Sequence, residues 1–429
     1  MQGAIATTIF VVSLVLIFAE WFHRTVIAIA GAILMVVAGK VLGFYAEGAA
    51  LDSIDFNTIG LLLGMMIVVA LLEPTGFFEY LALWAGRASK GRPLVVFLLL
   101  GAVTSVLSMF LDNVTTVVVI APVTLVIARV LEVDVMPLLV AEAMLSNVGG
   151  IATLVGDPPN ILIGSAAGLS FNAFLTHSLP IVLVLWVAAV ILLRFQFRGQ
   201  LVDRPGELAD ALRLHPSQAL KQPRVARRVL IVLGLAVVLF LFQEQLDISP
   251  ALIAMGAAGV ALLVVGPDVH ETFKRVEWSV LIFFSALFVM VGGLEAAGVL
   301  ARVAEWLGAA AVSVNPYLLG VAVIWVVALL SAVVDNVPIT IAVIPVVAGL
   351  EAAGVKIEPL WWALALGAGL GGNATVIGST ANIVVVSISE RSGHPIQSSQ
   401  WMRYGIPMML VTCTVASICY VALYPLLTR

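Results

Sequence analysis

Two segments of the chain place an aspartate and an asparagine side by side within long apolar runs. Residues 112–122 read DNVTTVVVIAP, and residues 335–345 read DNVPITIAVIP. An ionisable side chain in the middle of a membrane segment costs roughly 2.5–3.5 kcal/mol on insertion scales, so two of them in matching contexts indicate a function. A carboxylate in such a place can bind a proton, ligate a small cation or accept hydrogen bonds from a polar solute. The sequence therefore predicts one site assembled from both halves of the chain.

The composition is that of a membrane protein with several spans. Hydrophobic residues make up 62% of 429 positions, charged residues make up 11%, and the mean hydropathy is +1.14. Nothing in the sequence suggests a nucleic-acid partner. The two cysteines, Cys413 and Cys419, lie in the last apolar segment and predict neither a disulfide framework nor a thiolate metal site. The histidines show no metal spacing, so we expect no metal ion and no cofactor.

An internal repeat organises the sequence. A shift of 222 or 223 positions aligns polar, glycine, proline and tryptophan residues of the first half with equivalent residues of the second. The matching pairs include Asp55 and Glu277, Glu73 and Glu295, Trp84 and Trp306, Asp112 and Asp335, Asn113 and Asn336, Pro122 and Pro345, Thr153 and Thr375, and Asn160 and Asn382. We expect a duplication with one copy in residues 1–195, a second copy in residues 229–429, and a linker at 196–228.

Apolar length and Gly/Pro punctuation predict the same elements in each copy. The first copy is expected to hold helical segments at 4–22, 25–43, 57–86, 94–129, 137–168 and 174–195, and the second at 228–243, 249–266, 278–308, 317–349, 359–389 and 404–427. Asp-Asn interrupts 94–129 and 317–349, and a Gly-rich stretch interrupts 137–168 and 359–389. Broken helices in a membrane are tolerated only where protein or a water-filled cavity satisfies the freed backbone groups.

Basic residues predict the orientation of the chain. Lys and Arg outnumber Asp and Glu in the linker 196–228, which marks it as cytoplasmic, and the loop 87–92 is basic as well. Its counterpart at 309–316 has no charge and suits the outside. Equivalent loops on opposite sides mean that the repeats are inverted. We expect an all-α polytopic protein of the inner (plasma) membrane with five spans per repeat, two re-entrant hairpins, two broken helices and both termini extracytoplasmic.

Inverted repeats with broken helices are typical of secondary transporters, which bind their solute near the membrane midplane. We therefore expect the two Asp-Asn tips to meet the two interrupted helices. The candidate site residues of the first half are Asp112, Asn113, Thr115 and Thr116, facing Asn147, Gly149, Gly150, Thr153, Asp157 and Asn160. Those of the second half are Asp335, Asn336 and Thr340, facing Asn373, Thr375, Ser379, Thr380 and Asn382. Alternatively, each Asp-Asn pair only caps the half-helix that follows it, and capping can also coexist with binding.

The charges of the motifs limit the solute. Asp112, Asp157 and Asp335 are the candidate proton-coupling groups, and the motifs contain no Lys or Arg. His23 and Arg24 are interpreted as a short cytoplasmic turn, and Glu142 as a residue at the membrane edge. A site so poor in cations is badly suited to a di- or tricarboxylate. It suits a proton, a small cation or a small neutral molecule with several hydroxyl groups.

The blocks DNVTTVVVIAPV and NVGGIATLVGDPPNILIG, with their weaker second copies, resemble the ion transporter superfamily. The resemblance is to the branch that holds arsenite efflux permeases of the ArsB type, the melanosomal P protein and sodium/proton antiporters of the NhaD type. It implies a scaffold, a transport domain and an elevator-like movement. Dicarboxylate carriers of the superfamily often carry Ser-Asn-Thr at both tips, and the Asp-Asn tips of this chain argue against that substrate.

Within the branch, the match to arsenical pump membrane proteins implies export of arsenite and antimonite in exchange for protons. With only two cysteines, three-thiolate binding of arsenic is excluded, so the neutral hydroxide would be held by Asn, Thr, Asp and backbone groups. No nucleotide-binding motif is present, so an ATP-driven version needs a separate cytoplasmic ATPase, and we expect a transporter, not an enzyme. The alternatives are sodium/proton antiport through the same aspartates, a passive channel and an intramembrane aspartyl protease. The protease is disfavoured because each Asp belongs to its own repeated hairpin.

Overall fold

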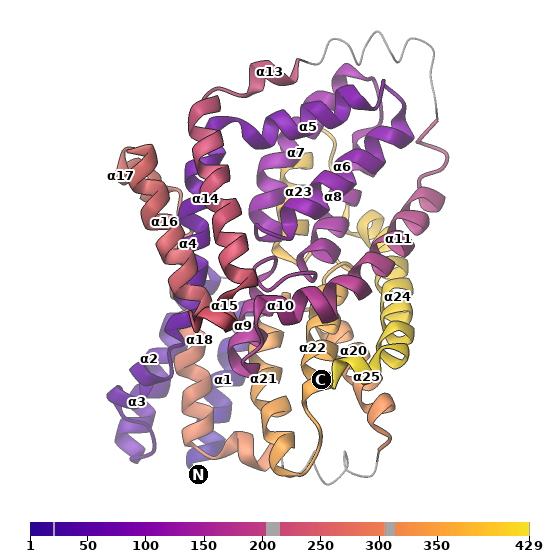
Figure 1. Ribbon diagram of the computed structural model, residues 1–429. Coiled ribbons are helices and arrows are strands. Elements are labelled where there is room, and N and C mark those ends of the chain that lie inside the picture. The colour runs from indigo at the N-terminus through magenta and orange to yellow at the C-terminus, as the bar shows by residue number, and fades with distance from the viewer. Residues whose placement is uncertain (20–21, 203–214, 304, 306–313, 429) are drawn as a thin grey trace.

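The computed structural model describes residues 1–19, 22–202, 215–303, 305 and 314–428, and this part of the chain is helical and contains no strand. Six of its helices are long and apolar enough to cross a membrane, and six shorter apolar helices accompany them. Figure 1 shows a tall bundle in which the helices of the two sequence halves interleave. The architecture is therefore that of a membrane protein with several spans, as the composition predicts.

The first half follows the predicted elements with one division. Its elements are α1 Gln2–Ala19, α2 Arg24–Leu42, α3 Glu47–Asp52, α4 Phe56–Leu72, η1 Glu73–Thr75, α5 Phe77–Ala88, α6 Pro93–Ser108, α7 Asn113–Val130, α8 Val135–Gly150, α9 Pro158–Ala167, α10 Phe171–Ala173, η2 Phe174–Ser178 and α11 Leu179–Gln196. The single span expected at 57–86 divides into α4 and α5, because Gly76 adopts a left-handed conformation with φ +76° after the 3-10 turn. The predicted breaks after 108 and after 150 are both present.

The second half has the same order of elements. It holds α13 Pro216–Ala219, α14 Pro223–Leu241, α15 Gln243–Leu246, α16 Pro250–Val265, α17 Val269–Lys274, α18 Trp278–Ala296, α20 Pro316–Ser331, α21 Asn336–Ala352, α22 Glu358–Gly371, α23 Thr380–Arg391, α24 Ser398–Ala422 and α25 Tyr424–Leu427. Helix α14 begins five residues before the expected 228, with Pro223 in its first turn. Residues 203–214 of the expected linker, and 304 and 306–308 of the expected span at 278–308, lie outside the described residues.

Two helical hairpins, α6–α7 and α20–α21, occupy opposite ends of the molecule (Figure 1). Helix α8 packs against α6 and α7, and α22 packs against α20 and α21. The second segment of each broken helix crosses to the other half of the sequence: α9 packs against α21, and α23 packs against α7 and α8. This exchange brings the two Asp-Asn tips into one region.

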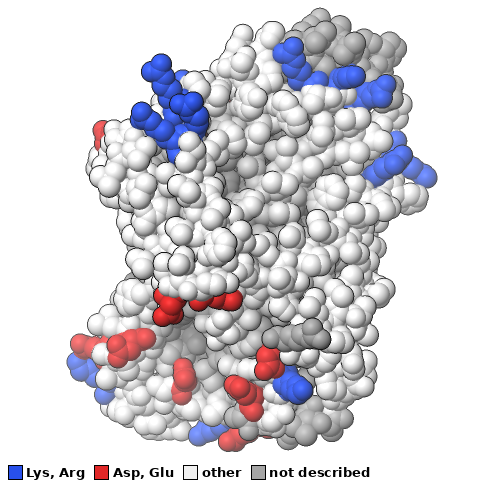
Figure 2. Space-filling model, viewed as in Figure 1, with Lys and Arg blue, Asp and Glu red and all other residues white. Residues whose placement is uncertain are grey.

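The remaining long helices form two groups beside the hairpins. Helices α1, α2 and α18 pack together, and α4, α14 and α16 pack together (Figure 1). Figure 2 shows Lys and Arg side chains gathered at the upper end of the same view, while most Asp and Glu side chains on this face lie in the lower half. On this face the acidic side chains are thus concentrated in the lower half, whereas basic side chains occur in both halves.

Small residues allow the hairpins to lie directly on the broken helices. A Cβ atom added to Gly149 would lie 2.6 Å from the carbonyl oxygen of Ser105, and one added to Gly371 would lie 2.3 Å from that of Ala328. The hydroxyl of Ser108 donates to the carbonyl of Ser146 at 2.8 Å, and an equivalent bond of 2.8 Å links Ser331 to Ala368. Close backbone approach at small residues is the usual basis of helix association in membranes. Gly149, a predicted site residue, thus has a packing role.

This packing predicts the effect of adding one methyl group. Gly371→Ala should lower the free energy of unfolding by about 1–3 kcal/mol, the usual cost of overpacking, because the obstructing atoms belong to the backbone of α20. Thermal unfolding of the purified protein in detergent measures the change. Gly256→Ala on α16 is the control, since no atom lies within 4 Å of its added Cβ and alanine favours a helix. Equal melting temperatures for the two variants would contradict the interpretation.

Candidate functional site

Asp112 lies at the tip of the first hairpin and caps α7. One of its carboxylate oxygens accepts the backbone N–H of Thr115 at 2.9 Å, and the other accepts the Thr115 hydroxyl at 2.5 Å. The capping interpretation therefore holds for this residue. These two bonds to Thr115 hold the carboxylate of Asp112 in place. Each oxygen accepts one of them and can still accept a hydrogen bond from another group. The neighbouring Thr116 is buried, and its hydroxyl has no hydrogen-bond partner in the described structure.

Asp335, at the tip of the second hairpin, is held by different groups. One oxygen accepts the backbone N–H of Val337 at 3.4 Å, and the other accepts the hydroxyl of Thr380 at 2.6 Å and the guanidinium of Arg24 at 3.0 Å. The Arg24 guanidinium also donates to Thr380 at 3.0 Å. The expectation of a site without cations is therefore wrong. Arg24 lies outside both repeated motifs, and only tertiary folding brings it to the tip.

Asp157 connects the first broken helix to the second hairpin. Its side chain is 2% exposed, and one oxygen accepts the amide of Asn336 at 2.9 Å. This contact to the second hairpin, which follows from the packing of α9 against α21, was not predicted. Asp157 precedes α9 but makes no capping bond, so most of its hydrogen-bonding capacity remains unused by the helix.

Asn147 on α8 is the centre of a buried amide network. Its carbonyl oxygen accepts Asn113 at 2.9 Å and the hydroxyl of Ser379 at 3.0 Å. Its amide nitrogen donates to Asn373 at 2.9 Å and to Asn382 at 3.1 Å. These five side chains are at most 3% exposed. A network satisfied in this way fixes the relative positions of four segments from both halves, and its members are predicted site residues.

Four further predicted residues satisfy the backbone at the two breaks. Asn160 donates to the carbonyls of Gly150 and Thr153 at 3.0 and 2.8 Å, and Asn382 donates to those of Gly372 and Thr375 at 2.7 and 2.9 Å. The hydroxyl of Thr153 donates to Met109, and that of Thr375 donates to Ala332 at 2.5 Å. The two Asn side chains thus supply hydrogen bonds that a broken helix needs inside a membrane. Thr340, within α21, donates to the carbonyl of Asn336 one turn earlier on the same helix at 2.8 Å.

A small cavity lies where the tips and breaks meet. This central cavity, of ≈ 40 Å³, is lined by polar groups of both halves and by apolar residues of α4 and α18. Its polar lining consists of Arg24, Asp112, Asn113, Asp157, Glu277, Asp335, Asn336, Ser379 and Thr380. A second cavity of ≈ 260 Å³, here called the vestibule, shares Asp112 and Glu277 with it and extends to Glu73 and Arg275. These two residues form an ion pair of 3.4 Å whose side chains are 38% and 43% exposed, so the vestibule leads to the surface.

Comparison with known proteins identifies the family. The profile of CitMHS, described as the citrate transporter family, matches residues 14–367. The chain belongs to this family. An uncharacterised transporter of Mycobacterium tuberculosis H37Rv is 41% identical, and the alignment covers 97% of this chain and 98% of the relative. The P protein of Homo sapiens is 33% identical, over 98% of this chain and 59% of the P protein.

The fold also has a solved counterpart. The YdaH transporter of Alcanivorax borkumensis superposes with a TM-score of 0.65 at 17% identity, over 94% of this chain and 99% of that one. This CitMHS member is therefore a membrane transporter and not an enzyme, and the predicted likeness to the P protein is confirmed.

Sequence reasoning missed two residues of the site of this CitMHS transporter, Arg24 and Glu277. Glu277 occupies the repeat position of Asp55, which caps α4 by accepting Asn57 N–H at 2.9 Å and the Thr58 hydroxyl at 2.6 Å. Glu277 makes no such bond at the start of α18 and instead lines both the central cavity and the vestibule. The sequence did hold a signal for Glu277, because a Glu replaces the shorter Asp55 at this repeated position. Arg24 carried no comparable signal.

Glu142, which was expected at the membrane edge, lies inside the protein. Its side chain is 0% exposed on α8, where it accepts a short hydrogen bond from the hydroxyl of Thr124 on α7. Helix α8 is covered on all sides, because the first hairpin, α11 and α23 all pack against it. A residue anywhere along this helix is therefore buried, whatever its distance from the ends.

The different roles of the two repeat-related acids can be tested in the CitMHS transporter. Asp55→Ala should lower the free energy of unfolding by about 0.5–2 kcal/mol, since it removes a helix cap. Glu277→Ala should leave the melting temperature nearly unchanged and impair solute transport, because this carboxylate lines the cavities and caps nothing. Thermal unfolding and transport assays of both variants, made side by side, measure the two effects. A larger stability loss in Glu277→Ala than in Asp55→Ala would refute the assignment.

Proposed function

We propose that this transporter exports small uncharged hydroxides, namely arsenite and antimonite in their neutral forms, in exchange for protons. The observation that carries the proposal is the lining of the central cavity, which combines carboxylates with amide and hydroxyl groups. Arg24 is the one Lys or Arg in that lining within the described residues, and it is already paired with Asp335 and Thr380. The site therefore offers mainly hydrogen-bond acceptors that carry negative charge.

A neutral trihydroxide matches these acceptors. Each of its hydroxyl groups can donate to a carboxylate, such as that of Asp112 or Asp157, and its oxygens can accept from the Asn and Ser side chains of the lining. Hydrogen bonds to charged groups are among the stronger ones, at about 1.5–3 kcal/mol each. Citrate, which the family description names, carries several carboxylates of its own. At Asp112, Asp157 and Glu277 it would meet like charges without a free cation, which disfavours it as the solute.

Asp157 is the proposed carrier of the coupled proton. It is 2% exposed, and its recorded partner is the neutral amide of Asn336. A charged carboxylate in such surroundings is costly unless it gains a proton or a ligand. If the solute binds when Asp157 is deprotonated, and the proton binds when the solute has left, each transport cycle exchanges the two. This competition is the proposed basis of proton-driven export.

The proposed mechanism uses the organisation inferred from the sequence. It comprises an inverted repeat with copies in 1–195 and 229–429, a cytoplasmic linker at 196–228, ten spans, both termini extracytoplasmic and an elevator-like movement in the plasma membrane. Support comes from the paired contacts, since the bonds of Asn160 and Thr153 recur at Asn382 and Thr375. The placement of the hairpins at opposite ends of the molecule supports it as well (Figure 1).

Sodium/proton antiport is the second candidate. The observation in its favour is the charge of the central cavity, where Asp112, Asp157, Glu277 and Asp335 face one arginine. Within the described residues, however, no three acidic, histidine or cysteine side chains are arranged to hold one metal ion.

Transport by everted membrane vesicles tests the proposal. An imposed proton gradient should drive arsenite uptake, and Asp112→Asn should reduce it about tenfold or more, because a charged acceptor worth about 1.5–3 kcal/mol is lost while Asn preserves the helix cap. Vesicles that move protons in response to sodium without arsenite would favour the second candidate, and proton-driven citrate uptake would contradict the charge argument. Uptake by the protein reconstituted alone would show that no ATPase subunit is needed.

A second variant tests the proton carrier separately. Asp157→Asn keeps an oxygen that can accept from Asn336 and removes the titratable group. We expect uptake driven by a pH gradient to be lost, whereas exchange of labelled for unlabelled arsenite across the same membrane is retained. Proteoliposomes containing the purified variant allow both measurements. Equal loss of gradient-driven uptake and of exchange would assign Asp157 to solute binding and not to coupling.

A further inference from the structure

A third cavity lies at the other end of the helix that borders the vestibule. This α4–α15 cavity, of ≈ 590 Å³, contacts α4 at Asn57, Thr58 and Leu61 and is closed by residues 243–250 around α15. The vestibule contacts α4 from Leu62 to Glu73. Phe56–Thr75 is apolar and long enough to cross a membrane, so the two cavities lie toward opposite ends of a candidate span.

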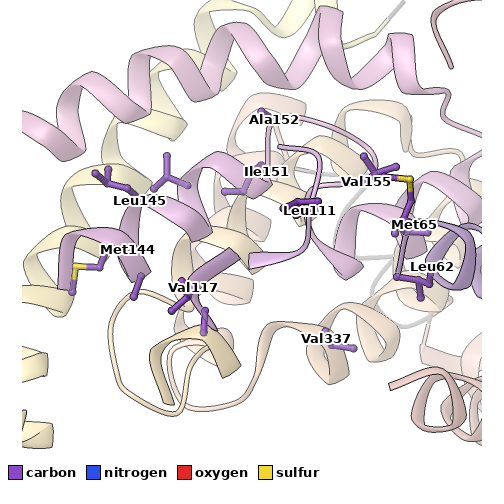
Figure 3. Packing of buried hydrophobic residues seen from close by; sticks show 14 of the residues in the cluster. Leu62, Met65, Leu111, Val117, Met144, Leu145, Ile151, Ala152, Val155 and Val337 are labelled. Atoms are coloured by element: carbon purple, nitrogen blue, oxygen red, sulfur yellow. The ribbon is translucent and has the colours of Figure 1, made fainter. Parts of the chain in front are cut away.

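Only a thin layer of side chains separates these two cavities. Leu61 lines the α4–α15 cavity, and the next residue, Leu62, lines the vestibule. Likewise, Leu154 lines the α4–α15 cavity and Val155 lines the vestibule. Ile161 on α9 lines both cavities. Figure 3 shows Val155 beside Met65, with Leu62 nearby on the same helix. We call Leu61, Leu62, Leu154, Val155 and Ile161 the apolar septum.

The septum is tightly packed. Its five side chains are 2–5% exposed. A Cβ atom added to Gly164, one turn after Ile161 on α9, would lie 2.3 Å from the Cδ1 atom of Leu154, so the helix backbone presses directly on the septum. Water enters a protein interior where there is room for at least one molecule and polar groups to bind it, and the septum offers neither. The crossing of an ion or a polar solute through such a layer carries the full cost of desolvation.

We propose that the apolar septum is the permeability barrier of this conformation and that Ile161 is its thinnest point. The inference rests on the proposed function only for the identity of the solute, since the barrier acts on any proton or small polar molecule in the vestibule. Ile161 then blocks the direct route along α4 from the vestibule to the α4–α15 cavity. Proton movement stays coupled to solute movement because both must pass through the central cavity. Loss of the Ile161 side chain would join the vestibule to the α4–α15 cavity.

Passive leak through proteoliposomes tests this inference. The full-length protein is reconstituted with a pH-sensitive dye inside, a pH step is applied without arsenite, and valinomycin with potassium removes the membrane potential. Ile161→Ala should collapse the pH gradient several-fold faster than the unmodified protein does, because the shortened side chain joins two cavities whose polar linings can hold a continuous file of water. Ile161→Leu preserves the volume and should not leak.

Ile163→Ala is the matched control. Ile163 lies on the same helix, is 0% exposed and packs in a separate apolar cluster with residues of α21 and α22. It loses the same atoms and should destabilise the protein similarly without increasing the leak. A folded Ile161→Ala protein that leaks no more than Ile163→Ala would overturn the inference. Failure of arsenite transport in the unmodified protein would affect the proposed function alone, because the leak assay contains no arsenite.

Discussion

The amide of Asn147 is the interaction on which the assembly of the site depends. It bonds four side chains, from the first hairpin, from the second break and from α23, and all of them are buried. An amide has two donors and two acceptor lone pairs, so these bonds use its whole capacity. Loss of one partner would leave a polar group unsatisfied in an apolar interior at a cost of about 1–3 kcal/mol. The first tip is therefore held against the second break and the start of α23 by a group that belongs to neither.

The charge of the central cavity follows from this assembly. Three acidic side chains of the central cavity come from different segments. The second hairpin contributes Asp335, the first break contributes Asp157, and the start of α18 contributes Glu277. Arg24 balances one of these charges through its 3.0 Å contact with Asp335. The carboxylate of Asp112 is stabilised by the start of α7 and by Thr115, which is a weaker compensation than a full positive charge. The site is therefore polar and acidic.

Much of the fold could be predicted because the decisive signals are local. Gly, Pro and Asp-Asn at fixed spacing mark the breaks of the helices, and their recurrence after 222 or 223 positions predicts a duplication. The partners of the site residues could not be predicted in the same way. Arg24 reaches Asp335 across 311 positions of sequence, and Asp157 bonds the hairpin of the other half. The burial of Glu142 depends on the helices that surround α8, and a single repeat contains no information about them.

The exchange of half-helices between the two sequence halves has a mechanical consequence. Helix α9 lies on α21, and α23 lies on α7 and α8, so each hairpin is clamped by a segment that belongs to the other half. If the second hairpin swung open by itself, the bond between Asp157 and Asn336 would have to break, and if the first did, the bond between Asn113 and Asn147 would have to break. Stiff coupling of this kind favours displacement of both hairpins together, as one body sliding against α4 and α18, over the independent flapping of two lids.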